Sequence, residues 1–476
     1  MSNRSLWPTG GSPGWPRSAP RQQAPGDLVD GRPAGWKPGS LPAERTGVEE
    51  ATARGAVADI NRALDDQITA DTTPEQARML IAAEVRAWIA DQAGSGRYRL
   101  TAELEARLVG AVYNERFGLG ALQPLLEDPD IETIDVNGAH QVWINYADGR
   151  KEPGEPVADS DAQLVELIRR WGAYQGQTAR DFSPAKPKLR LALPDGSRLT
   201  ALMAVTPRPC LSIRRHRMLD VDLDQLVDNG TLDPGLREFL RAAVTARKDI
   251  VVTGGMGSGK TTFARALAAD FDRDERIVTI ENEYELFLHT LPHRHADIVA
   301  MEAREPNAEG VGAIPVRQLV TDALRLNAKR IIVGEVLGDE LVPMLTAMNT
   351  GGEGSLCTIH ADSAGEVFAR MLVLADSGGL TYPPATLFQL AGMAVDFVVH
   401  LTHQVHHRHG HPVNQRYVSE VLEVLPPGDT DEPATNQVYV PGRDGRAVPH
   451  TLPQCAAELQ AAGFDLSHFH VEARAR

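Results

Sequence analysis

The feature that most constrains the fold of this chain is a glycine-rich segment between a short apolar run and a helical pattern. The segment carries the spacing G-x-x-x-x-G-K-[ST] from Gly254 to Thr261, with KDIVVTGG leading into it and TTFARALAADF following. Two further runs, RIVTIEN and RIIVGEV, are also short, continuous and rich in β-branched residues, and helical patterns separate them. Because such runs are typical of strands buried on both faces, the sequence predicts an α/β domain with a parallel sheet.

The glycine-rich segment has the chemistry of a phosphate-binding loop. Its glycines let successive backbone N–H groups turn toward a phosphate chain, and the N-terminus of the following helix adds a partial positive charge. Lys260 can neutralise β and γ oxygens, and Thr261 can hold Mg²⁺. Strand, motif and helix together favour this interpretation over a turn that merely caps a helix. The predicted cofactor-binding residues are Gly254, Gly255, Gly257, Ser258, Gly259, Lys260, Thr261 and Thr262.

Carboxylates follow two other predicted strands. Glu335 lies near the end of RIIVGEV, and a carboxylate at the carboxyl edge of a parallel sheet can hold a metal-bound water or orient an attacking water. We therefore predict Glu335 as a catalytic residue and, with Thr261, as a metal ligand. The segment 281–285 begins at the end of RIVTIEN and contains three glutamates. Either one of them positions the attacking water or all lie in a solvated loop, and the pattern alone does not decide between these.

His360 lies in GGEGSLCTIHADS, after a short apolar run. A histidine in this place is a satisfied core residue, a metal ligand, or a group that senses something small and charged. The histidine-rich tract 403–412 lies between two apolar runs, so a solvated hairpin turn explains it better than a metal site.

Composition excludes several classes of protein. With 64 acidic and 48 basic residues the formal charge is −16, which has the wrong sign for a chain held on nucleic acid, so no direct nucleic-acid partner is expected. The three cysteines, Cys210, Cys357 and Cys455, are scattered and indicate neither a disulfide framework nor a zinc site, which fits a reducing cytoplasm. No apolar stretch approaches the length of a membrane span.

Changes in composition and periodicity divide the chain into six segments. We expect a disordered Pro- and Gly-rich tail at 1–55, amphipathic helices at 56–104, a small α+β domain at 105–206, a connector at 207–232, the α/β nucleotide-binding domain at 233–425 and a C-terminal extension at 426–476.

Taken in order, the motifs resemble those of the type II/type IV secretion system ATPase family, and most closely its CpaF/TadA-like subfamily of Tad (Flp-type) pilus assembly ATPases. The resemblance covers about residues 100–425. It rests on LQPLLEDPDIETIDVNG and LPDGSRL in the first part, and on GGMGSGKTT, RIVTIEN, EAREPNAEGVGAIPVRQLVTDALRLNAKRIIVGEV, AMNTGGEGS and TIHADS in the second.

The resemblance implies a RecA-like P-loop ATPase domain that uses ATP and Mg²⁺. It also implies a cytoplasmic homohexamer, peripherally associated with the inner face of the membrane through an inner-membrane platform protein. Such a motor drives Tad-like pilus assembly or type II-like protein secretion. Two alternatives stay open: the ATPase of a conjugative type IV secretion system, and a slowly hydrolysing ATP-binding switch or scaffold.

The resemblance also assigns roles to individual residues. Lys260 and Thr261 match the Walker A site, Glu335 the Walker B glutamate and Glu281 the acidic position of the Asp box, which serves water activation. His360 matches the histidine-box residue, a sensor near the γ-phosphate. The catalytic arginines that the family carries in its N-terminal domain and connector correspond to Arg198 and to Arg214 or Arg215.

Four positions depart from the family pattern. Where relatives commonly carry Asp, Pro, Arg and His, this chain has Asn282, Glu305, Leu337 and Gly352. Because these changes affect residues that communicate rather than bind phosphate, the sequence favours a divergent member with slow or partner-dependent turnover.

Overall fold

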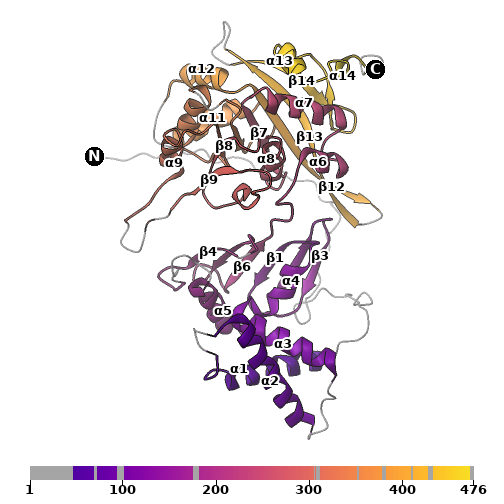
Figure 1. The fold of residues 1–476 in the computed structure, drawn as a ribbon, viewed down its shortest axis with the longest axis vertical. Helices are drawn as coiled ribbons and strands as arrows, with labels where there is room; N and C mark the ends of the chain where they lie inside the picture. The colour runs from indigo at the N-terminus through magenta and orange to yellow at the C-terminus, as the bar shows by residue number, and fades with distance from the viewer. Residues whose placement is uncertain are drawn as a thin grey trace, which may run out of the picture. The chain divides into compact units, whose positions relative to one another are not determined.

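The computed structural model describes residues 47–68, 72–93, 101–174, 182–193, 195–304, 306, 311–350, 353–377, 382–408, 411–426 and 433–471 (Figure 1). The chain divides into two compact units, Met1–Tyr113 and Asn114–Arg476. Most of the tail expected at 1–55 lies outside the described residues, and the first described helix begins within it, at Gly47.

The first unit is helical, as the apolar periodicity predicts. Its helices are α1 (Gly47–Ala63), α2 (Pro74–Ala93) and α3 (Ala102–Phe117), the last of which continues into the second unit. Leucine, isoleucine and valine side chains at helical spacing form its small core: Ile60, Leu64, Ile81, Val85, Ile89, Leu108 and Val112.

The second unit begins with an α+β domain, residues 120–214, which we call the N-terminal domain. An antiparallel sheet of six strands runs in the order β3-β2-β1-β6-β5-β4, and the amphipathic helix α5 (Asp161–Tyr174) packs on it through a face that includes Leu164 and Trp171. Short helical segments η1 (Gly120–Leu122) and α4 (Gln123–Glu127) precede the sheet. The strands are β1 (Ile131–Asn137), β2 (Val142–Tyr146), β3 (Lys151–Gly154), β4 (Lys188–Ala192), β5 (Arg198–Leu202) and β6 (Cys210–Arg214).

Strand β6 differs from expectation, because it lies within the segment predicted as a connector. It pairs with both β1 and β5 in the middle of the sheet. Leu211 and Ile213 alternate into the core, but the run is only five residues long, and Pro207 and Pro209 precede it. A short strand flanked by breakers and charges therefore reads as a loop in the sequence.

The rest of the second unit is built on a sheet of nine strands in the order β15-β14-β13-β12-β7-β11-β10-β8-β9. The six strands from β12 to β9 are parallel, which confirms the predicted α/β fold, and β13 to β15 continue the sheet in antiparallel pairs. The strands are β7 (Ile250–Gly254), β8 (Arg276–Glu281), β9 (Asp297–Glu302), β10 (Arg330–Val333), β11 (Leu356–Ile359), β12 (Phe397–Arg408), β13 (His411–Leu425), β14 (Ala434–Pro441) and β15 (Ala447–Pro449).

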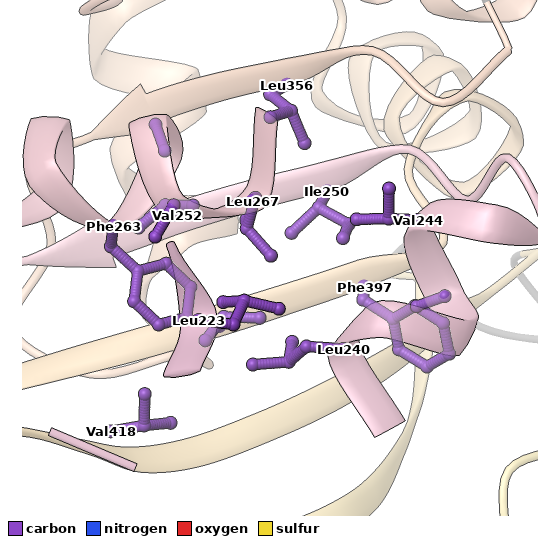
Figure 2. Packing of buried hydrophobic residues seen from close by; sticks show 14 of the residues in the cluster. Leu223, Leu240, Val244, Ile250, Val252, Phe263, Leu267, Leu356, Phe397 and Val418 are labelled. Atoms are coloured by element: carbon purple, nitrogen blue, oxygen red, sulfur yellow. The ribbon is translucent and has the colours of Figure 1, made fainter. Parts of the chain in front are cut away.

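Helices cover both faces of this sheet, and Figure 1 shows α9, α11 and α12 gathered on the other side from α6, α7 and α8. Along β7, Ile250 and Val252 enter one apolar layer, drawn in Figure 2, whereas Val251 enters the opposite layer. This explains why the strand is apolar at consecutive positions. The helices are α6 (Leu223–Asp228), α7 (Pro234–Thr245), α8 (Lys260–Ala268), α9 (Val316–Ala323), α10 (Leu341–Asn349), α11 (Val367–Ser377) and α12 (Pro384–Ala394), with the short turn η2 (Leu288–Thr290).

The C-terminal extension expected at 426–476 contains both helices and strands. Besides α13 (Ala456–Ala461) and α14 (His468–Val471), it supplies β14 and β15. Val438 and Tyr439 of β14 are buried in the same apolar layer as Phe239 of α7. None of the described helices combines the length and the apolar composition that crossing a membrane requires.

Candidate functional site

The phosphate loop joins the end of β7 to the start of α8. Gly254 has φ +152° and Gly259, the residue before the helix, has φ +94°, conformations that favour glycine. A Cβ atom on Gly254 would lie 2.5 Å from both the Leu401 carbonyl oxygen and Ser258 Oγ. The loop therefore needs glycine for conformation and for space. The other predicted binding residues on this loop and the first turn of α8 are Gly255, Gly257, Lys260, Thr261 and Thr262.

Lys260 is buried against this loop, with only 7% of its surface exposed. Its Nζ donates to the carbonyl oxygens of Gly254 and Gly255, both at 3.0 Å, and lies 3.1 Å from His360 Nδ1. Burial lowers the pKa of Lys260 to about 8, although the Glu335 carboxylate opposes this shift. An anionic ligand in the loop would raise this pKa again, because it stabilises the charged ammonium group.

Glu335 and His360 meet because they follow neighbouring parallel strands, β10 and β11. His360 Nε2 lies 2.6 Å from Glu335 Oε1, and both side chains are about one third exposed. His360 is therefore not a buried core histidine. It connects the carboxylate to Lys260 across the carboxyl edge of the sheet.

Glu281 ends β8 beside this pair and is almost fully buried. Its Oε1 accepts backbone N–H groups of Glu285 at 2.9 Å and Leu286 at 2.8 Å, while Oε2 has no partner among the described residues. Burial raises the pKa of Glu281 to about 7, and the two backbone hydrogen bonds oppose that rise. A carboxylate with a pKa near neutrality is suited to accept a proton from water.

Glu285 completes the acidic cluster and touches the phosphate loop directly. Thr261 Oγ1 donates to Glu285 Oε2 at 2.9 Å, Arg198 forms an ion pair with the same carboxylate, and Arg198 NH2 also donates to the Glu283 carbonyl at 2.6 Å. Burial is the largest influence on Glu285 and raises its pKa, but the charge of Arg198, together with smaller contributions that include the hydrogen bond from Thr261, outweighs burial and the net shift of the pKa is downward. The family resemblance predicts Glu281 for this site, whereas the sequence does not single out Glu285, and the structure brings both glutamates to the site.

The three predicted arginines separate into two groups. Arg198 and Arg214 are cross-strand partners in β5 and β6, and the charge of Arg214 contributes to the lowered pKa of Lys260. Arg215 points elsewhere, because its guanidinium donates to the Asp128 carbonyl within the N-terminal domain. The structure therefore brings Arg198 and Arg214 to the site and leaves Arg215 as a structural contact.

Sequence reasoning missed Arg265, which lies on α8 and is 2% exposed. It donates to the carbonyl oxygens of Leu286 at 3.1 Å and Met218 at 2.7 Å, and also to that of Glu285. Burial lowers the pKa of Arg265 to about 10. This arginine fixes the backbone that carries the acidic cluster. The sequence does contain one indication of this role, namely a charged residue within the otherwise largely apolar helix that follows the loop.

Two of the four departures from the family pattern are described. Asn282 is exposed beside the acidic cluster, and Leu337, two residues after Glu335, is 50% exposed. Glu305 and Gly352 lie outside the described residues.

The residues fit a magnesium-bound nucleoside triphosphate. Ser258 Oγ is buried and, among the described residues, has no hydrogen-bond partner, so the loop presents an unused polar atom next to Lys260. Thr261 Oγ1 and Glu335 would hold the metal ion, and Glu285 lies in contact with the same threonine.

Comparison with known proteins shows the family of this chain. The family described as "Type II/IV secretion system protein" matches residues 122–423. A "Putative conjugal transfer protein" of Mycobacterium tuberculosis is 37% identical over 292 residues, covering 60% of this chain and 81% of that protein. Type IV secretion system protein VirB11 of Brucella suis is 30% identical over 335 residues, covering 64% of this chain and 89% of that protein.

The crystal structure of the VirB11 ATPase from the Brucella suis type IV secretion system, in complex with sulphate, is 27% identical in sequence. It covers 66% of this chain and 96% of its own, with a TM-score of 0.33. The family match spans more than half of the length of this chain and includes the site residues. The chain therefore belongs to the type II/IV secretion system protein family.

Proposed function

We propose that this chain is an ATPase that binds Mg·ATP at the phosphate loop and hydrolyses it. The observation that carries the proposal is the convergence of Lys260, His360, Glu335 and the Thr261–Glu285 pair at one edge of the parallel sheet. Each of these groups has a counterpart in the chemistry of phosphoryl transfer.

The residues divide the work as follows. Loop N–H groups and Lys260 bind the phosphate chain, and Arg198 and Arg214 supply positive charge from the N-terminal domain. Glu335 orients the attacking water, and the raised pKa of Glu281 lets this carboxyl accept a proton at neutral pH. When bound, Mg²⁺ neutralises phosphate charge. His360 touches both Lys260 and Glu335, so it registers whether the loop is filled.

The function of this ATPase, in our proposal, is to drive a secretion or pilus machine as a homohexamer whose N-terminal domains move during the cycle. The sequence motifs support a Tad-like pilus assembly or type II-like secretion motor, docked in the cytoplasm on an inner-membrane platform protein. The names of the relatives support the second candidate, the motor of a conjugative type IV system.

These two candidates predict different phenotypes in the source organism. Replacing the gene with a Glu335→Gln allele abolishes surface pili or protein secretion in the first case, and abolishes DNA transfer in the second. If the Glu335→Gln allele leaves pili, protein secretion and DNA transfer all intact, the motor assignment is refuted.

The hydrolysis step is tested with purified protein. We expect phosphate release per subunit to rise with protein concentration, because a site completed between subunits needs the assembled ring. We expect it to fall in Glu335→Gln, because this carboxylate orients the attacking water. The departures at Asn282 and Leu337 favour slow or partner-dependent turnover, so brisk turnover by the isolated protein would contradict that part. Tight ATP binding without turnover at any concentration supports the switch or scaffold instead.

A further inference from the structure

The long hairpin of β12 and β13 places an arginine on the phosphate loop. Arg416 Nε donates to the Gly257 carbonyl at 2.7 Å, and its Cδ lies 3.7 Å from the position that a Cβ on Gly259 would occupy. The arginine therefore lies along the loop and touches it on the side of the hairpin. None of the motifs in the sequence includes this residue.

This contact fixes the orientation of one peptide group of the loop. In a trans peptide the N–H points away from the carbonyl, so anchoring the Gly257 carbonyl on Arg416 directs the Ser258 N–H to the opposite side. There the N–H faces the Gly255 carbonyl oxygen, at 3.4 Å. Arg416 thus fixes the peptide group between Gly257 and Ser258, in a loop whose backbone N–H groups are the expected phosphate donors.

The second partner of Arg416 comes from the N-terminal domain. Its NH2 lies 3.0 Å from Glu132 Oε1, on β1. Two residues earlier, the Asn414 side chain donates to the Ala147 carbonyl at 3.2 Å, and the Asn414 backbone N–H donates to the Asp148 backbone carbonyl at 3.4 Å. The hairpin therefore bridges the loop and the first sheet, with Arg416 bonded to both.

We propose that Arg416 is a positioning residue that couples the N-terminal domain to the phosphate loop, so that the Glu132 contact sets how well the loop binds nucleotide. This inference rests on the proposed nucleotide-binding function. A purely structural arginine would stabilise the fold equally but would leave nucleotide affinity unchanged.

The test compares Arg416→Ala with a matched control, Arg276→Ala, in the full-length protein. Arg276 also bonds one carbonyl, that of Leu326 at 2.7 Å, and one carboxylate, Asp297 at 2.6 Å. Its side chain is 32% exposed against 29% for Arg416, but it lies at the N-terminal end of β8, the end opposite to Glu281. The two variants should therefore lose similar stability, measured as Tm.

Affinity for a fluorescent ADP analogue with Mg²⁺ separates the two variants. We expect Arg416→Ala to weaken binding about tenfold, the change that loss of one charged hydrogen bond commonly produces. Arg276→Ala should bind like wild type. Arg416→Lys can reach only one of the two partners and should fall between wild type and alanine.

Coupling to the N-terminal domain is tested with a double-mutant cycle. Glu132→Gln should weaken binding less than Arg416→Ala, and the double variant should bind no worse than Arg416→Ala alone. Unchanged affinity in Arg416→Ala, or independent effects of the two substitutions, would overturn the inference. If the wild-type protein itself fails to bind the analogue, the proposed function fails first, and the two failures are thereby distinguished.

Discussion

Replacing Arg198 by alanine removes a direct contact between the N-terminal domain and the acidic cluster of the nucleotide site. The guanidinium pairs with Glu285 and donates to the Glu283 carbonyl at 2.6 Å, and both charged side chains are 23% exposed. Charged hydrogen bonds in such partly buried places contribute about 1.5 to 3 kcal/mol. We therefore expect a measurable fall in Tm for Arg198→Ala.

The effect on catalysis should be larger than the effect on stability. If Arg198 also meets the charge that develops on the phosphate, its loss should lower kcat on the order of 10³- to 10⁵-fold, as for other arginines in that role. That corresponds to about 4 to 7 kcal/mol of activation free energy. The partner variant Glu285→Gln keeps the arginine and should retain much more activity.

The assay is phosphate release at saturating Mg·ATP and at a protein concentration where wild-type activity per subunit has reached its plateau. Thermal unfolding of the same samples separates folding from catalysis. A kcat for Arg198→Ala within about threefold of wild type, with Tm lowered, would refute the catalytic role and leave a structural ion pair.

Three further substitutions give predictions at separate points of the molecule. His360→Asn should lower kcat about 5- to 150-fold while nucleotide affinity stays within a few fold, because it breaks the link between phosphate loop and Glu335; equal losses in both would count against a sensing role. Gly254→Ala should lower the free energy of unfolding by roughly 1 to 3 kcal/mol, seen as a lower Tm, and should abolish binding of the ADP analogue, because the added Cβ meets the Leu401 carbonyl. Normal binding would show that the loop tolerates the change. Burial raises the pKa of Asp249 to about 8 from an ordinary 3.8, so between these values the folded chain binds the proton more tightly than the unfolded chain. Stability should therefore fall as pH rises across that range, by up to about 1.4 kcal/mol per pH unit, and Asp249→Asn should flatten the decline in Tm; a variant with the same slope as wild type would contradict this assignment.

Local patterns predict the core of the second unit well. In the run IVVTG, consecutive residues must be apolar because Ile250 and Val251 enter opposite apolar layers. A continuous apolar run is therefore visible in the sequence and predicts a strand buried on both faces. Glu335 is predictable for a related reason, because it follows a recognisable strand and the ends of parallel strands meet at one edge. His360 follows the neighbouring strand, but its role was predicted from the family resemblance and not from that position.

Contacts between distant segments could not be predicted in this way. Arg416 lies 159 residues from Gly257 and 284 from Glu132, and nothing in its own neighbourhood marks it as part of a phosphate site. Glu285 was one of several similar glutamates, and only the fold shows that it contacts Thr261. The sequence did not predict strand β6, because its apolar pattern is short and interrupted. The strand forms because it pairs with a neighbouring strand on each side.

The most direct test of the account is a comparison of ATP binding and ATP hydrolysis in wild type and Glu335→Gln. A glutamine in place of Glu335 keeps a side-chain oxygen that can hold the metal ion but loses the carboxylate charge that orients the attacking water. We therefore predict that the variant binds Mg·ATP with near wild-type affinity and retains it unhydrolysed. Hydrolysis by the variant at the wild-type rate, or failure of the wild-type protein to bind ATP, would contradict the central claim.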